Sequence, residues 1–112
     1  MEDQLYAYHA EMCRVLAHAK RLELIDILRD KEMSAGELGE RLGLAPSNLS
    51  QHLAMMRERR ILVSRKEGNV VYYRIANSHL FEAFDLLREI MFEQIRQDAA
   101  LIGAHKSKLE VG

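Results

Sequence analysis

Cysteine and proline are almost absent from the chain, with one of each among 112 residues, and long apolar runs are missing. A lone cysteine, Cys13, excludes an internal disulfide and fits a reducing compartment. The apolar stretches fall far short of the roughly 20 residues that cross a bilayer. The first residues, MEDQLYAYHAE, are acidic and lack the apolar segment of a signal peptide. We therefore expect a cytoplasmic protein with no membrane contact.

The length and composition predict one small, helix-rich globular domain. The chain is 48% apolar and 29% charged and holds no low-complexity segment. At 112 residues it leaves no room for a separate sensor domain, so any regulatory signal must act on the one fold. We expect this domain at residues 1–100 and a frayed tail at 101–112, where the sequence becomes small and polar.

The net charge of −1 hides an uneven distribution of charge along the chain. Between Pro46 and Ala76 six cations stand against two anions, which gives this segment +4 and leaves −5 for the remainder. Such a local excess is typical of a surface that meets nucleic acid, although a solvated charged face has the same composition. The cations are Arg57, Arg59, Arg60, Arg65, Lys66 and Arg74.

Two helices joined by a glycine-containing turn are predicted in the middle of the chain. Ser34 and Glu37 have the spacing of a capping box, in which the Ser34 hydroxyl accepts from the Glu37 amide and the Glu37 carboxylate reaches back to the Ser34 amide. The first helix should end at Gly43, and Pro46 suits the first turn of the next. Helix, tight turn and helix is the spacing of a helix-turn-helix, here with Ala45 as a poor N-cap.

The second of these helices, expected at 46–60, has two contrasting faces. The core face groups residues within about 60° of one another at 100° per residue: Leu49, Leu53, Met56 and Arg60. The opposite face is small and polar: Ser47, Ser50, Gln51 and Ala54. A merely solvated face usually carries Glu and Lys, whereas short side chains let a helix enter the major groove and a Gln can hydrogen-bond a base edge. We interpret this helix as a DNA-reading helix.

A β-hairpin is predicted at 61–75, around the turn signal Glu67-Gly68-Asn69. Alternation along its second strand assigns three residues to the core: Val71, Tyr73 and Ile75. The residues expected to touch phosphates or the minor groove are Arg65, Lys66 and Asn69.

The helix predicted after Ser78 is apolar on more sides than one small domain can cover. Such a helix needs burial against a partner, and a symmetric homodimer supplies it. Two-fold DNA sites would also require a dimer; the alternative is the core helix of a monomer. Earlier helices predicted at 5–19 and 22–28 carry apolar residues at the same spacing. The candidate interface residues are Leu5, His9, Met12, Phe84, Leu87, Met91 and Ile95.

The order of the predicted helices and strands, together with the runs NLSQHL at 48–53 and RKEGNVVYYR at 65–74, resembles the ArsR/SmtB family of bacterial and archaeal repressors. The run LAHAKRL at 16–22 is similar to the Leu-Ala-Asp-Pro-Thr-Arg-Leu junction of that family, with Ala19 in place of the proline. The resemblance covers about residues 5–98. It implies a mainly α winged helix-turn-helix of five helices with a β-hairpin wing, dimerised through its first and last helices. It also implies release from DNA when an inducer binds or a thiol is modified.

The metal sites that the resemblance implies are not matched by the residues present. The Cys-Val-Cys element of arsenic sensors would fall at 34–39, which holds no thiol or imidazole. Zinc sensors need Asp-x-His and then His-x-x-His or His-x-x-Glu in the last helix, where this chain has DLL at 85–87 and QIRQ at 94–97. The second thiol of two-cysteine relatives would fall at Phe84. We therefore expect no metal site and no cofactor.

Cys13 is the remaining sensor candidate. Its thiolate could bind a soft ligand, be oxidised or meet Cys13 of a second chain; the alternative is a small buried hydrophobe. A small-molecule inducer is a second route to regulation. His9 is interpreted as a partly buried imidazole rather than a ligand. His52 lies between the core and reading faces of its helix and should contact a phosphate.

These observations predict a sequence-specific repressor that binds double-stranded operator DNA as a homodimer. Two alternatives remain: a thiol or metalloid switch acting through Cys13, and a winged helix that binds proteins instead of DNA. An enzyme is disfavoured because Asp85, Glu89 and Glu93 have the helical spacing of a solvated edge, without a catalytic triad or phosphate loop. The DNA-binding candidates are Pro46, Ser47, Asn48, Ser50, Gln51, His52, Arg57, Arg65, Lys66 and Asn69.

Overall fold

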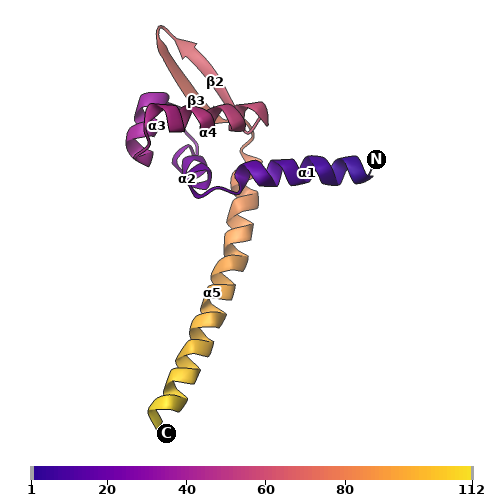
Figure 1. Ribbon diagram of the computed structural model, residues 1–112, viewed down its shortest axis with the longest axis vertical. Helices are drawn as coiled ribbons and strands as arrows, with labels where there is room; N and C mark the ends of the chain where they lie inside the picture. The colour runs from indigo at the N-terminus through magenta and orange to yellow at the C-terminus, as the bar shows by residue number, and fades with distance from the viewer. Residues whose placement is uncertain (1, 112) are drawn as a thin grey trace. The chain divides into compact units, whose positions relative to one another are not determined.

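The computed structural model describes the backbone of residues 2–111 and the side chains of residues 2–103. The chain divides between Ser78 and His79 into two compact units. The first holds α1 (Glu2–Leu16), α2 (Ala19–Ile27), β1 (Met33–Ser34), α3 (Ala35–Leu42), α4 (Pro46–Glu58), β2 (Leu62–Glu67) and β3 (Val70–Ile75). The second is the single helix α5 (His79–Val111). This is the mainly α, winged helix-turn-helix architecture that the sequence predicts (Figure 1).

The junction between α1 and α2 is set by a histidine. His18 is the N-cap of α2, and its Nδ1 accepts a hydrogen bond from the Lys20 amide at 3.2 Å. α1 therefore ends at Leu16, earlier than the predicted Ala19. Histidine is not among the preferred N-cap residues, so helical spacing alone did not place this boundary.

The capping residues predicted for α3 act at both of its ends. The Ser34 hydroxyl accepts from the Glu37 amide at 3.1 Å and also donates to the Glu37 carboxylate at 3.1 Å. The carboxylate thus bonds the hydroxyl, where the prediction gave it the Ser34 amide. Gly43 ends the helix in the left-handed region at a φ of 65°, which a glycine adopts without steric cost.

The sheet contains one strand more than the predicted hairpin. β2 and β3 pair antiparallel from Leu62 opposite Ile75 to Glu67 opposite Val70. β1 adds to the other edge of β3, so the order is β1-β3-β2. A two-residue strand is too short to show alternation in the sequence, and it was not predicted. It ties the start of α3 to the wing formed by β2 and β3.

The core of the first unit lies between α2, α3, α4 and the inner face of the sheet. Its most deeply buried side chains are Leu24, Ile25, Leu28, Leu38 and Met56. Of the strand residues assigned to the core, Tyr73 and Ile75 are buried and Val71 is half-buried. Burial of each large apolar side chain contributes about 1.5 to 3 kcal/mol, so this core fixes where α4 and the wing stand.

The helix α5 runs through the segment where the sequence predicts a frayed tail. Its last residue is Val111, and the backbone of 101–111 is helical. Within that stretch Gly103 is the only residue that strongly disfavours a helix, and fraying of this end stays a prediction. None of the described helices combines the length and apolar character that a membrane span requires.

Candidate nucleic-acid interface

The helix α4 presents the two faces that its sequence predicts. Leu49, Leu53 and Met56 point inward with 3%, 3% and 0% of their surface exposed. The opposite face is exposed and consists of Ser47, Ser50, Gln51 and Ala54. α4 packs against β2 and lies across the base of the wing, which projects beyond it (Figure 1). One assignment was wrong: Arg60 lies outside the helix, exposed and with a φ of 59°, because α4 ends at Glu58 and Arg59 is its C-cap.

The predicted DNA-binding residues lie together in the first unit. Those from Pro46 to Arg57 are on α4, Arg65 and Lys66 are on β2, and Asn69 follows Gly68 in the turn of the wing. All of them are exposed except His52, which is half-buried. Pro46 occupies the first turn of α4, and the N-cap Ala45 makes no side-chain hydrogen bond, as expected.

His52 is engaged on the inner side of α4. Its Nδ1 accepts a hydrogen bond from Nε of Arg21 at 3.0 Å, and its ring meets that of His18 edge to face with centroids 4.6 Å apart. Burial lowers the pKa of His52, and the neighbouring His18 and Arg21 lower it further. The ring is therefore neutral at pH 7 with its proton on Nε2. The predicted phosphate contact stays a prediction, and Nε2 is the atom that could donate to the phosphate.

Arg21, which sequence reasoning missed, ties α4 to the end of α1. Besides His52, its guanidinium donates to the Val15 carbonyl at 2.9 Å and to the Met55 sulfur at 3.0 Å. A second link joins the same two helices, because Arg59 pairs with Glu11 at 3.2 Å. No periodicity marks Arg21, since it is a charged residue whose partners are far away in the sequence. These contacts fix the orientation of α4 relative to α1.

On the wing, Arg65 is paired with two carboxylates of the protein, and its predicted contact with phosphate stays a prediction. The Arg65 guanidinium binds both carboxylate oxygens of Glu32, with Nε 2.8 Å from Oε1 and 2.9 Å from Oε2, and its Nη1 lies 2.7 Å from Glu67. It also lies 4.5 Å from the centre of the Tyr72 ring. The hydrogen bond from Arg65 lowers the pKa of Glu32, and the charge of Arg74 acts in the same direction. Arg65 is thus already held by carboxylates.

Lys66, next to Arg65 on β2, stands apart from this cluster. It is exposed and, among the residues whose side chains are described, makes no recorded ion pair. It lies opposite Val71 in the ladder, whereas Arg65 lies opposite Tyr72, so the two cations alternate between the faces of the wing. Lys66 is therefore the cation on the outer half of β2 that is available to a phosphate.

The described residues offer one apolar hollow beside the reading helix and no metal cluster. The hollow, of about 540 Å³, lies between α3 and the start of α4 and includes Gly39, Leu44, Pro46 and Ser50 in its lining. Within residues 2–103 no three His, Cys, Asp or Glu side chains come together as a metal site would need. Cys13 is exposed on α1.

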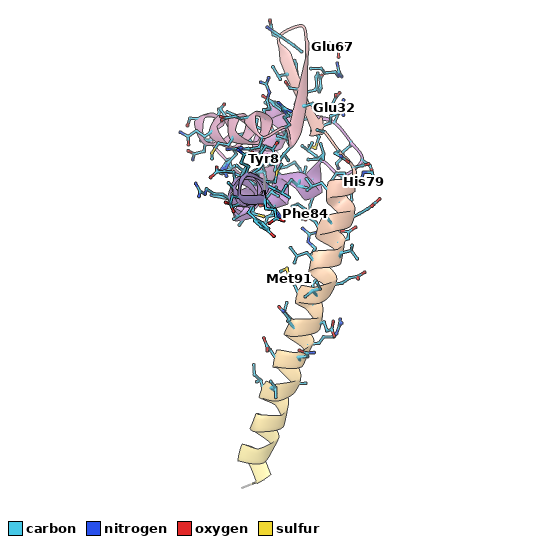
Figure 2. The ribbon with its side chains drawn as sticks, turned by 90° about the vertical axis from the view of Figure 1, so that its right-hand side faces the viewer. Tyr8, Glu32, Glu67, His79, Phe84 and Met91 are labelled. Carbon is cyan, nitrogen blue, oxygen red and sulfur yellow. The ribbon has the colours of Figure 1, made fainter. Side chains whose placement is uncertain are left out.

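The predicted dimer residues leave much apolar surface open in each unit. On α1, Leu5 is 63% exposed, His9 is exposed and Met12 is half-buried. On α5, where Figure 2 labels Phe84 and Met91, Phe84 is half-buried. The other predicted α5 residues are exposed, by 52% for Leu87, 45% for Met91 and 57% for Ile95. Further exposed apolar residues are Tyr6 and Tyr8 on α1 and Leu86, Ile90 and Phe92 on α5.

The helix-turn-helix packs on the core by its inner face, exposes a polar face on its second helix and adjoins a β-hairpin. These features define the class of protein: a winged helix-turn-helix regulator. The family model described as "Bacterial regulatory protein, arsR family" matches residues 18–64. Over 101 residues the chain is 31% identical to the uncharacterized HTH-type transcriptional regulator Rv0081 of Mycobacterium tuberculosis, covering 89% of each chain. The chain belongs to the arsR family, whose members are transcriptional regulators rather than enzymes.

Three further comparisons agree with this assignment. The chain is 40% identical over 70 residues to the HTH-type transcriptional regulator KmtR of M. tuberculosis, a match that spans 62% of this chain and 54% of KmtR. The crystal structure of Rv0081 matches with a TM-score of 0.79 over 85% of this chain and 96% of that one, at 31% identity. That of the transcriptional repressor BigR from Xylella fastidiosa matches with a TM-score of 0.69 over 80% and 91%, at 28% identity.

Proposed function

We propose that this protein is a homodimeric transcriptional repressor that works in the cytoplasm, binding double-stranded operator DNA through α4 and the wing. The observation that carries the proposal is the outer face of α4. It holds Ser47, Asn48, Ser50 and Gln51, exposed and without recorded hydrogen bonds of their side chains within the described residues, over a fully buried inner face. A helix of this kind is rigidly mounted and presents short polar groups to a groove.

Within that face, Gln51 is the residue best suited to read a base. A glutamine amide can bind the N6 and N7 edge of adenine in a bidentate manner, which supplies about 1 to 3 kcal/mol of discrimination. Ser47 and Ser50, one turn apart, are short enough to keep the helix close to the groove floor. Lys66 and Asn69 on the wing would add contacts to phosphate or the minor groove.

The homodimer is supported by the apolar surface of α1 and α5. Residues such as Leu5 and Ile95 are more than half exposed in the single chain, and apolar surface on this scale is usually covered by a partner. A two-fold dimer places two reading helices about one turn of DNA apart, roughly 10 bp. Sedimentation velocity at micromolar protein concentration tests the oligomeric state. A dimer is expected, and a monomer would contradict the proposed homodimer.

DNA binding is tested by fluorescence anisotropy with a duplex from upstream of the gene and a scrambled duplex, across a salt series. Preferential binding to the native duplex is expected, with a logarithmic salt slope of several units. Equal, weak binding to both would favour the protein-interaction alternative. Repression is tested with a reporter driven by the same upstream region, whose output should rise when the gene is deleted; a fall would mean activation.

Release by a signal is part of the proposal, with Cys13 as the thiol candidate. In the single chain this side chain is exposed, so the alternative of a buried hydrophobe does not describe its surroundings there. An exposed thiol on a helix with open apolar surface is accessible to oxidants and soft ligands. Cys13→Ser should abolish release from DNA by oxidant or arsenite; an unchanged response would leave a small-molecule inducer as the route.

A further inference from the structure

The guanidinium of Arg65 is shared between two carboxylates from different parts of the chain. Glu67 is its neighbour on the same face of β2, whereas Glu32 lies just before β1, on the far edge of the sheet. Figure 2 labels Glu32 and Glu67 on the same side of the wing. Glu32 approaches with both oxygens, and its Oε1 is also 2.6 Å from Nη2. This is the two-pronged geometry in which an arginine also binds a phosphate.

The ion pair between Arg65 and Glu32 can be exchanged for one between Arg65 and another anion. The Arg65 side chain is 51% exposed and that of Glu32 is 27% exposed, and solvated ion pairs of this kind contribute little to stability. A DNA phosphate near the wing offers the same bidentate acceptor with the same sign of charge. Glu32 occupies the Nε and Nη2 edge of the guanidinium, and two anions cannot share that edge, so a phosphate that binds it must displace Glu32.

We propose that Glu32 is an intramolecular competitor of DNA phosphate for Arg65 and thereby limits the affinity and salt dependence of DNA binding. The inference rests on the proposed function. Glu32 is assigned this role rather than Glu67 because it contributes two oxygens, and Glu67 is 68% exposed with one contact. The segment from Pro46 to Ala76 has a formal charge of +4. Glu32 lies outside this segment in the sequence but pairs with its Arg65, so the local charge falls to +3.

The competition predicts a gain of DNA binding when Glu32 loses its charge. For Glu32→Gln we expect about three- to tenfold tighter binding to a scrambled duplex at low salt, and a salt slope steeper by about 0.9, the value for one additional phosphate contact. A Gln at this position can still accept one hydrogen bond from Arg65. Glu32→Ala removes that bond too and should change binding in the same direction.

Two controls separate competition from a general effect of charge. Glu23→Gln removes the same charge from another exposed ion pair, with Lys20 on α2, and should leave the slope unchanged. In an Arg65→Ala background, Glu32→Gln should no longer steepen the slope, because no guanidinium is released. Urea unfolding of each variant identifies any loss of folded protein before DNA is added.

Each outcome of these measurements either supports or overturns the proposed competition. A steeper slope for Glu32→Gln that disappears with Arg65→Ala supports the competition. The same change in both backgrounds, equal effects of Glu32→Gln and Glu23→Gln, or weaker binding by Glu32→Gln each overturn it, the last because Glu32 would then be positioning the wing. If the wild-type protein binds neither duplex, the proposed function itself is overturned. If the wild type binds and Glu32→Gln has no effect, only the competition is overturned.

Discussion

The outer face of α4 and the wing are both exposed and both predicted to touch DNA, yet they differ in how their polar groups are used within the protein. The face of α4 around Ser50 and Gln51 is uncharged and makes no recorded side-chain hydrogen bonds within the described residues. On the wing, Arg65 is bound by Glu32 and Glu67 and stacked near Tyr72. Lys66 alone extends from the outer half of β2 without a recorded ion pair.

This difference teaches that the two regions do different work. Base edges are recognised by hydrogen bonds, so a reading face keeps its donors and acceptors unused until DNA arrives. Phosphates are bound by charge, and a wing whose charge is partly neutralised holds DNA less tightly. We therefore propose that α4 discriminates between DNA sequences and that the wing sets the strength of DNA binding.

The largest effect should come from removing the support behind α4. Arg21→Ala leaves the Val15 carbonyl and His52 Nδ1 without their donor, and hydrogen bonds from charged groups contribute about 1.5 to 3 kcal/mol each before solvent screening. We expect a loss of about 2 to 3 kcal/mol in the free energy of unfolding in urea. Arg21→Lys cannot reproduce the planar fork and should restore less than half; full restoration would show that charge alone suffices.

A change of specificity should follow from the reading face itself. Gln51→Ala should weaken binding to the native duplex by about ten- to a hundredfold, the worth of a bidentate base contact, while binding to the scrambled duplex stays the same. Ala54→Ser on the same exposed face is the matched control, since it alters the surface without removing a predicted base contact. Equal losses on both duplexes would assign Gln51 to phosphate contact instead.

A smaller effect should separate the two cations of the wing. Lys66→Ala should weaken binding to both duplexes by a few fold and lower the salt slope by about 0.9. Arg65→Ala should lower the slope by less, because its charge is already compensated by Glu32 and Glu67. The opposite ranking would show that the carboxylates release Arg65 completely when DNA binds.

The smallest effect should be a dependence of stability on pH through His52. Its pKa in the folded protein lies below the ordinary 6.5, first because of burial and then because of His18 and Arg21. The unfolded chain then binds more protons, so stability is fully present above 6.5 and falls as the pH drops below it. His52→Asn, which keeps an acceptor for Arg21, should lose less stability between about pH 7 and about pH 5. Parallel curves for the two proteins would contradict this.

Much of the fold could be predicted because local signals determine it. Ser34, Gly43 and Pro46 place α3 and α4 through capping and turn chemistry, and the spacing of Leu49, Leu53 and Met56 fixes the inner face of α4. The strand β1 was missed because two residues show no period.

The charged contacts at the site could not be predicted in the same way. Glu32 meets Arg65 and Arg21 meets His52 across more than thirty residues of sequence, at separations of 33 and 31. Such pairs are brought together by the packed core and the sheet order rather than by neighbouring residues. This is why neither the pairing of Arg65 with Glu32 nor the link between α1 and α4 was foreseen.

The most direct test of the account is the ratio of affinities for the native and scrambled duplexes, measured by anisotropy at one salt concentration for wild type, Gln51→Ala and Lys66→Ala. We predict that Gln51→Ala brings the ratio towards one, whereas Lys66→Ala weakens both affinities and keeps the wild-type ratio. A collapse of the ratio in Lys66→Ala with an unchanged ratio in Gln51→Ala would contradict the division of work between α4 and the wing.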